Sequence, residues 1–465
     1  NNVAIGFQSL DADTTGFHNT AVGTSSIGAN TTGNNNTAVG YDVFSSNTTG
    51  SNNTALGVTA LAANTTANGS TGLGYQALQA NTTGATNTAV GYTALLANTT
   101  GANNTAVGAS SLDANTTGAN LSALGGFSLS ANTEGSNNTA SGYASLFSNT
   151  TGASNTASGL NALYNNTTAS NNTAVGANAL LANTTGTRNS AVGGNALDAN
   201  TTGNYNTSVG YNSSSANTTG THNTIVGDYA FADNTTGIHN VAIGQSALGA
   251  NTSGANNVAV GSASLDAATT AANNVAVGVN ALGRATTGHT NTIIGHEAAE
   301  NITTGDNNVC VGYIAGAQGE IINIIDVDNR AVFGNNSTTN SYIKVDWTVT
   351  SDQRDKTDIT DFTHGLDYAN QLRPVNFVWD ERSNYENGIP DGSKKKSDVQ
   401  LGFLAQEVLA IETGLGIDNN AIVDTEFPDN LKMTNVKLIP VLVKALQELS
   451  AKNDALEARI TTLEG

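Results

Sequence analysis

A repeat of fixed length governs the first two thirds of this sequence. One glycine marks each copy and recurs every 17 residues from Gly6 to Gly312 without insertion or deletion, in 18 steps and therefore 19 copies. The consensus reads Asn-Thr-Ala-Val-Gly-Tyr-x-Ala-Leu-x-Ala-Asn-Thr-Thr-Gly-x-x. Because no copy breaks the spacing, each must stack in register on the next. A period of this kind is typical of a solenoid.

The length of the period selects the kind of solenoid. Seventeen residues are too few for a pair of helices, which needs more than about 30, but they suffice for one coil of two short strands and two turns. We therefore predict a mostly β chain with a parallel β-solenoid, or β-roll, over residues 1–317. An aliphatic residue precedes most marker glycines, as at Val39, and Leu or Phe follows five residues later. The sequence thus predicts two inward stacks with a small residue, such as Ala60, between them.

The phrase Asn-Thr-Thr-Gly, as at residues 47–50, is the expected turn of each coil. Glycine there would supply a positive φ at low steric cost, while Asn and Thr side chains bond nearby backbone or stack in polar ladders. The Asn-x-Thr triplets also match the glycosylation acceptor pattern. We prefer the turn explanation because the triplets recur with the coil and no secretory signal accompanies them.

Charge, hydropathy and cysteine content exclude several kinds of binding partner and site. Residues 1–312 hold 12 acidic and 2 basic residues, and residues 313–465 hold 24 and 14, so each part carries a net charge of −10. An acidic surface repels polyanions, so nucleic acid is not an expected partner. No run of 18 apolar residues occurs, so no membrane insertion is expected. The single Cys310 excludes an intrachain disulfide and a cysteine zinc site, and no metal or cofactor is expected.

Acidic residues in the repeats are candidates for a glycosidase site. Solenoids that cleave polysaccharides need paired carboxylates in a groove, but the acids here lie at different repeat positions. The closest groups are Asp11 with Asp13, and Glu297 with Glu300 beside His296. Surface variation is the preferred interpretation, so no enzyme activity is expected in the repeats.

Tyrosine often follows the marker glycine, as at Tyr41 and Tyr92. These rings are either a packing stripe or, where exposed, platforms that stack on sugars. A coil this thin buries little apolar surface by itself, and three chains side by side would cover the remainder. The repeats therefore favour a homotrimer.

The sequence changes character after the last repeat. A β-rich capping junction is expected over residues 318–350, around Ile321–Ile325 and Tyr342–Trp347. A small mixed α/β domain is expected over 351–436, and a coiled-coil helix over 437–465. Apolar residues and one Asn follow steps of three and four along that helix and form a heptad seam: Ile439, Leu442, Leu446, Leu449, Asn453, Leu456, Ile460 and Leu463. The seam alone does not choose between two and three strands.

Ser351 and Lys356 form a candidate nucleophile and base. A serine hydroxyl is a poor nucleophile until a base takes its proton, and a lysine becomes that base when burial or nearby charge favours its neutral form. A solvated charged loop is the alternative interpretation of the same spacing. The rest of the tail decides between the two.

The tail resembles the C-terminal intramolecular chaperone domain of phage tail spikes and fibres, the endosialidase-type self-cleaving domain. Four features occur in the order of that family: Ser351-Asp352-x-Arg354-x-Lys356-x-Asp358-Ile359, Leu372-Arg373-Pro374-Val375-Asn376-Phe377-Val378-Trp379, Gly402-Phe403-Leu404-Ala405-Gln406-Glu407-Val408, and the closing helix around Leu438–Leu449. They cover about the last quarter of the chain. Their joint occurrence is far more specific than any one of them.

The resemblance implies a self-cleaving chaperone over residues 351–436. In that family the bond before the motif serine is cut, which here is Thr350–Ser351, and the released part is a trimeric folding aid. The serine nucleophile and lysine base of the family match Ser351 and Lys356. The resemblance therefore implies a single-turnover serine–lysine autopeptidase. The side chains expected to shape the loop or to orient the reacting groups are Asp352, Arg354, Gln406 and Glu407.

The repeats are also similar to the left-handed β-roll heads of trimeric autotransporter adhesins, which carry comparable Asn-x-Ala-Ile/Val-Gly phrases. Those repeats are generally shorter, and no outer-membrane anchor follows here. We therefore expect a virion tail-fibre fragment, assembled in the host bacterial cytoplasm, whose homotrimeric shaft attaches to a host-surface glycan or receptor. A chain that starts inside a repeat without Met is expected to lack an upstream attachment part. The alternatives are a structural adhesin whose tail only trimerises, and a carbohydrate-degrading tailspike.

Overall fold

The computed structural model describes residues 1–317, 326–338, 351–382, 385–386, 388–417, 421–425 and 431–465. The chain divides into two compact units, Asn1–Thr338 and Thr339–Gly465, and each is described by itself. Of the expected junction, Ile321–Ile325 and Tyr342–Trp347 lie outside the described residues.

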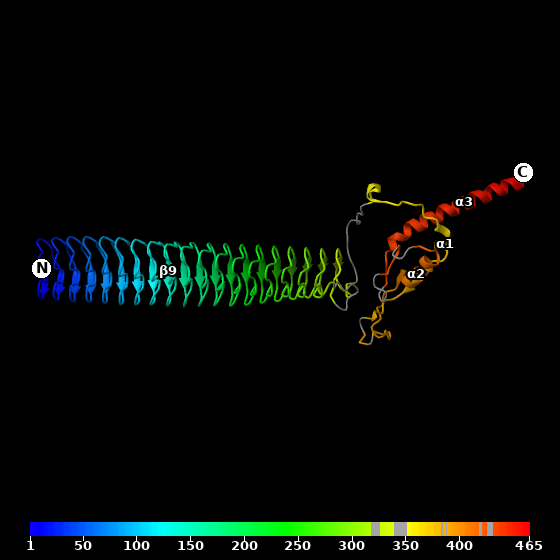
Figure 1. Ribbon diagram of the computed structural model, residues 1–465. Helices are drawn as coiled ribbons and strands as arrows, with labels where there is room; N and C mark the ends of the chain where they lie inside the picture. The colour runs from blue at the N-terminus through cyan, green and yellow to red at the C-terminus, as the bar shows by residue number, and fades with distance from the viewer. Residues whose placement is uncertain (318–325, 339–350, 383–384, 387, 418–420, 426–430) are drawn as a thin grey trace. The chain divides into compact units, whose positions relative to one another are not determined.

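The first unit is a parallel β-solenoid, as the repeat predicts (Figure 1). Every strand pairs in parallel with the next strand of the sequence, and matching repeat positions face each other. The described residues of this unit form 20 strands of three residues each: β1 Val3–Ile5, β2 Thr20–Val22, β3 Thr37–Val39, β4 Thr54–Leu56, β5 Thr71–Leu73, β6 Thr88–Val90, β7 Thr105–Val107, β8 Ser122–Leu124, β9 Thr139–Ser141, β10 Thr156–Ser158, β11 Thr173–Val175, β12 Ser190–Val192, β13 Thr207–Val209, β14 Thr224–Val226, β15 Val241–Ile243, β16 Val258–Val260, β17 Val275–Val277, β18 Thr292–Ile294, β19 Val309–Val311 and β20 Ala331–Phe333.

The expected pair of strands per coil is wrong, because each coil contains one strand and a return segment made of turns. In that segment, residues such as Gln76 and Leu78 take left-handed backbone angles, with φ of 58° and 55°. The side chain of Leu78 is fully buried, as are Leu61 and Leu95 on the neighbouring coils. One predicted inward stack, together with the small residues beside it, is therefore confirmed.

The other predicted stack is wrong, because the aliphatic residue before the marker glycine lies on the outer face. Successive strand residues point to opposite sides, so only one of Ala55 and Leu56 can enter the coil. Ala55 is buried, whereas Leu56 is 50% exposed. In this coil the methyl group faces the interior and the larger side chain stays outside, although the same inward position holds Ile225 in another coil.

The positive φ also belongs to a different glycine from the one predicted. The marker Gly57 has φ of +130°, and a Cβ there would lie 2.3 Å from the carbonyl oxygen of Gly74 on the next coil. The turn glycine Gly50 has no positive φ. A Cβ there would lie 2.4 Å from Asn47 Oδ1 and 2.5 Å from the carbonyl oxygen of Ala67, so this close approach favours glycine, although Ala67 itself takes the same position in the next coil.

Two columns of buried asparagines bond successive coils. In the first, Asn132 Nδ2 donates to Asn115 Oδ1 at 2.8 Å and to the carbonyl oxygen of Gly135 at 3.0 Å, and Asn149 repeats the pattern. In the second, the Asn172 amide N–H donates to Asn155 Oδ1 at 3.0 Å. The Asn-Thr-Thr triplets thus bury their asparagine, which supports the turn explanation over glycosylation.

The solenoid continues one coil beyond the last repeat. Strand β20 pairs with β19 in the same register, but Val309 now faces Ala331, a step of 22 residues instead of 17. Asn307 Nδ2 donates to Asn329 Oδ1 at 2.7 Å across the same step. The described part of the expected junction is therefore an additional, longer coil.

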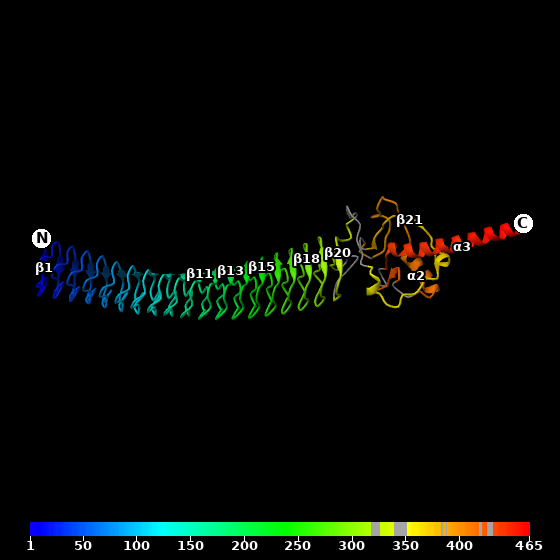
Figure 2. The ribbon, with the colours of Figure 1, turned by 90° about the horizontal axis from the view of Figure 1, so that it is seen from above.

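The second unit is small and mixed (Figure 2). Its helices are the 3₁₀ helices η1 Gln353–Asp355 and η3 Asn435–Lys437 and the α-helices α1 Gly365–Ala369, α2 Ala405–Gly414 and α3 Leu438–Glu464. Its strands form two antiparallel pairs: β21 Val375–Phe377 with β22 Gln400–Gly402, and β23 Val423–Asp424 with β24 Lys432–Met433. No helix in the described residues has the length and apolar character that crossing a bilayer requires.

The first turns of α3 complete the core of this unit. Buried residues of α1, α2, β23 and α3 pack together: Tyr368, Val408, Ile411, Ile422, Val423, Leu438 and Val441. A Cβ on Gly365 would lie 2.6 Å from the backbone nitrogen of Ala445, so glycine allows α1 to approach α3 closely. The rest of α3 projects beyond this core as a continuous helix.

Candidate autoproteolytic site

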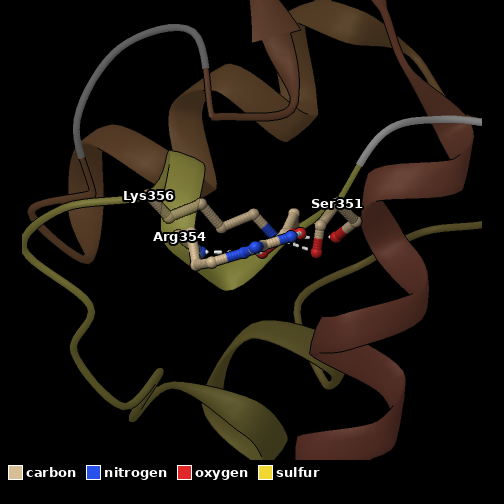
Figure 3. Close-up of polar contacts among 4 residues, drawn as sticks. Ser351, Arg354 and Lys356 are labelled. Carbon is tan, nitrogen blue, oxygen red and sulfur yellow. Dashed lines mark hydrogen bonds and ion pairs between the residues drawn. The ribbon is translucent and has the colours of Figure 1, made fainter.

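A single turn of 3₁₀ helix joins the two residues of the predicted dyad. Ser351 and Lys356 flank η1, and the backbone N–H of Lys356 closes the turn on the carbonyl oxygen of Gln353 at 3.1 Å. The Lys356 side chain then extends back along the turn, and its Nζ donates to Ser351 Oγ at 2.6 Å (Figure 3). A separation of this size is within reach of direct proton transfer.

Asp352 and Arg354 build the turn that holds the dyad. Asp352 caps η1 because its Oδ1 accepts the Arg354 backbone N–H at 2.9 Å. The Arg354 guanidinium also contacts both oxygens of this carboxylate, with an Nη2–Oδ2 distance of 2.5 Å. The hydrogen bonds from Arg354 lower the pKa of Asp352, which therefore remains a carboxylate. This geometry suits the predicted loop-shaping role.

The dyad is open to solvent in the single chain. Ser351 and Lys356 are exposed, and Asp352 is half-buried. Thr350, which carries the carbonyl group that the serine would attack, lies outside the described residues. No group of three or more His, Cys, Asp or Glu side chains in the described residues is placed to hold a metal ion.

Gln406 and Glu407, the other predicted support residues, lie at the start of α2 rather than in η1. Glu407 pairs with Arg373: its Oε2 accepts from Arg373 Nε at 3.1 Å, and its Oε1 contacts Arg373 Nη2. This hydrogen bonding lowers the pKa of Glu407 and raises that of Arg373. Gln406 is exposed. The described contacts thus assign Glu407 to a surface ion pair and not to the dyad.

The contacts that connect the motifs of the tail are not predicted by the sequence patterns. The Arg373–Glu407 pair and the β21–β22 ladder join the second motif to the third. Glu448, on α3, accepts the backbone N–H of Leu366 at 2.8 Å and so fixes the start of α1. Buried Glu412 accepts the backbone N–H of Ile422 at 2.8 Å. A mid-helix carboxylate gives no local sequence signal for such contacts.

The predicted seam of α3 is exposed along its length in the single chain. Leu446 is 68% exposed and Leu463 is 84% exposed, whereas Val441 and Ala445, which flank the seam on the first turns of the helix, are buried. An apolar row that one chain leaves uncovered is available to other chains.

These features define a class of protein: a β-solenoid shaft followed by a small domain that presents a serine–lysine pair and a long apolar helix. Residues 351–417 match a peptidase family described as chaperone of endosialidase, which implies an intramolecular chaperone with autoproteolytic activity. This match and the solenoid confirm the predicted resemblance to a phage tail fibre or tailspike. A search of curated proteins found no match.

Proposed function

We propose that this chain forms the homotrimeric shaft of a phage tail fibre, and that its tail drives assembly and then cuts itself off. The observation that carries the proposal is the 2.6 Å contact between Lys356 Nζ and Ser351 Oγ inside a segment that matches a peptidase family. The serine is the nucleophile and the lysine is its base. The bond to be cut is Thr350–Ser351.

The reaction is intramolecular. The neutral Lys356 amine takes the Ser351 hydroxyl proton, and Oγ attacks the carbonyl carbon of Thr350, which is the serine's own preceding peptide group. The C–N bond breaks, the Ser351 nitrogen takes up a proton, and an ester joins Thr350 to Oγ. Water hydrolyses the ester, which leaves a carboxylate on Thr350 and Ser351 as the new N-terminus. Holding the two groups together gives this step the advantage of proximity.

Assembly would activate the dyad. An exposed lysine is protonated near neutral pH and is a poor base, whereas desolvation favours the neutral amine. Neighbouring chains, held by the α3 seam, are the source of that desolvation. A cut that requires the trimer would keep unassembled chains attached to their chaperone.

The shaft also supports the trimer proposal. Apolar residues flank the marker glycines on both sides and are exposed in one chain, for example Leu124 at 47% and Tyr143 at 57%. Rows of this length exceed the isolated apolar residues that are normal on a protein surface. The tyrosine rings also pack along the shaft within one chain, since Tyr143 lies edge-on to Phe127 with ring centres 5.7 Å apart.

Denaturing gel electrophoresis of the purified protein tests the cleavage. The wild type should give two pieces separated at Thr350–Ser351, confirmed by N-terminal sequencing of the released tail. Ser351→Ala and Lys356→Ala should each give a full-length chain whose sedimentation mass is still that of three chains. Ser397→Ala and Lys395→Ala, exposed residues of a loop in the same domain, are the matched controls and should cleave normally.

Cleavage at the normal rate in both dyad variants would show that the dyad is misassigned. A full-length wild-type trimer would favour the structural adhesin, whose tail assembles without cutting. Release of sugar from host polysaccharide by the purified shaft would favour the carbohydrate-degrading tailspike.

A further inference from the structure

One exposed column of the shaft departs from its usual composition over four successive coils. The column lies five residues before the marker glycine, and Asn is its commonest residue. In other coils this position is occupied by Gly, Ser, Thr or one isolated histidine, His18. In the four coils that end at Gly193, Gly210, Gly227 and Gly244, its residues are Arg188, Tyr205, His222 and His239. We call these four residues the ring ladder.

The members of the ring ladder stack on one another. The Arg188 guanidinium lies 5.2 Å from the centre of the Tyr205 ring, and its Nη1 also bonds the tyrosine hydroxyl. The rings of Tyr205 and His222 are 4.8 Å apart with an angle of 17°, and those of His222 and His239 are 4.9 Å apart with an angle of 26°. These distances match the spacing of about 4.8 Å between strands. The ladder is therefore continuous along the coil axis.

The ring ladder is a cluster of side chains that can donate hydrogen bonds, on a shaft that is otherwise acidic. All four side chains are exposed. Arg188 is one of two basic residues in 1–312, the other being Arg284, and the three residues on either side of each ladder position carry no charge. Because the ring faces are stacked, the ring edges meet solvent; of the imidazole nitrogens, His222 Nδ1 also contacts Thr221 Oγ1 at 3.1 Å. Together with the forked guanidinium, these edges suit carboxylate groups.

The fold does not require these side chains. All four residues have φ of 58–59°, a left-handed conformation that Asn tolerates better than Tyr or Arg. Asn at this column also bonds between coils, as where Asn120 Nδ2 donates to Asn137 Oδ1 at 3.1 Å. Four successive coils thus carry larger exposed side chains at a position where Asn suits the left-handed backbone better. Departures of this kind are a basis for inferring function.

We propose that the ring ladder binds a linear acidic polysaccharide, with uronic or sialic acid carboxylates on Arg188 and the imidazole edges and the sugar chain along the coil axis. A polymer, rather than a single sugar, can contact four groups that repeat at the coil spacing. The remaining acidic surface repels polyanions, so binding is confined to the ladder and weakens with salt. The inference rests on the host-attachment role that the sequence leads us to expect for the proposed tail-fibre shaft, and it assigns that role a site.

Binding of defined oligosaccharides to the full chain tests the proposal. The probes are oligogalacturonate and oligosialate, with a neutral glucose oligomer of the same length as the comparison, measured by calorimetry at low and physiological salt. At least one acidic probe should bind and the neutral one should not. A variant with Arg188→Asn, Tyr205→Asn, His222→Asn and His239→Asn returns the column to its commonest residue and should weaken binding at least tenfold. His18→Asn, in the same column but isolated, is the matched control and should bind normally.

Three results would overturn the proposal: no binding of either acidic probe at millimolar concentration, equal binding of the neutral probe, or unchanged binding by the four-residue variant. A sedimentation mass that changes in the variant would assign the ladder to contacts between chains and would also overturn it. Cleavage at Thr350–Ser351 is scored on the same samples. It is independent of the ladder, so failure of this site is distinguishable from failure of the chaperone proposal.

Discussion

At the scale of single residues, two adjacent serines show how the thin interior treats polar groups. Ser213 Oγ donates to the carbonyl oxygen of Gly210 at 2.9 Å and accepts from Ser208 Oγ at 2.6 Å. Ser214 occupies a position where most coils have Leu, and its buried Oγ has no hydrogen-bond partner in the described residues. The Ser213 hydroxyl therefore has hydrogen-bond partners, whereas the buried Ser214 hydroxyl has none among the described residues.

Alanine at these two positions should therefore act in opposite directions. Ser214→Ala removes a buried hydroxyl without a partner and should stabilise the shaft by about 1 kcal/mol. Ser213→Ala removes two hydrogen bonds and should destabilise it by about 1–3 kcal/mol. Thermal unfolding of the two variants, followed by circular dichroism, measures both changes. Equal shifts of the same sign would contradict the assignment of the two hydroxyls.

The Arg373–Glu407 pair makes a prediction about pH. The arginine lowers the pKa of Glu407 in the folded domain, so the stabilisation from this pair is present above the ordinary glutamate pKa of about 4.3. It is lost as pH falls through the lower folded-state pKa. Arg373→Gln should raise the pKa of Glu407, which an NMR titration of the carboxyl group measures. An unchanged titration would mean that the pair does not form in solution.

At the scale of elements, the buried asparagine columns connect the coils. Asn132→Ala deletes the bonds to Asn115 and Gly135 and removes the acceptor of Asn149 Nδ2. Buried groups left unpaired in this way cost about 1–3 kcal/mol each. The variant should therefore unfold at lower denaturant concentration. Thr151→Ala, an exposed change in a neighbouring coil, is the control and should have little effect.

Much of the shaft could be predicted from the sequence, because a strict period forces equivalent residues into columns. The inward row of Leu61 and Leu78 and the polar ladders followed from that period. The side on which Leu56 lies did not follow, because hydrophobicity favoured the larger residue, whereas the direction of the strand turns Ala55 inward. In the tail, the Ser351–Lys356 contact is local and followed from a motif. The Arg373–Glu407 contact depends on tertiary packing, which no local pattern encodes.

The seam of α3 includes one polar residue, Asn453, whose Nδ2 contacts Glu457 Oε1 at 3.1 Å in the single chain. A seam asparagine fixes register and chain number at a cost in stability. Asn453→Leu should therefore raise the melting temperature of the released tail and give a mixture of oligomers in sedimentation. Asp454→Leu, outside the seam, should leave the mass distribution unchanged. A single unchanged trimer in Asn453→Leu would mean that register is set elsewhere.

At the scale of the whole molecule, the shaft and the tail solve different parts of one assembly problem. The shaft's coils make local contacts once stacked. In the proposed trimer, three chains would first have to meet in register, and their exposed apolar rows invite wrong pairing. A coiled coil at the end of each chain raises the local concentration of the others. Under the proposed function, the tail would be needed to begin assembly and not to maintain the shaft.

Removing the tail before and after folding should therefore give different results. A gene truncated after residue 350 should yield aggregates, because the shaft strands lose the helix that aligns three chains. A shaft freed after folding, by its own cleavage at Thr350–Ser351, should remain a soluble trimer whose unfolding is slow, because its persistence is then kinetic. Sedimentation and melting of the two samples make the comparison, and supplying the tail as a separate chain should not rescue the truncated one. If the truncated chain folds alone to a soluble trimer with the same melting behaviour, the tail is not a chaperone.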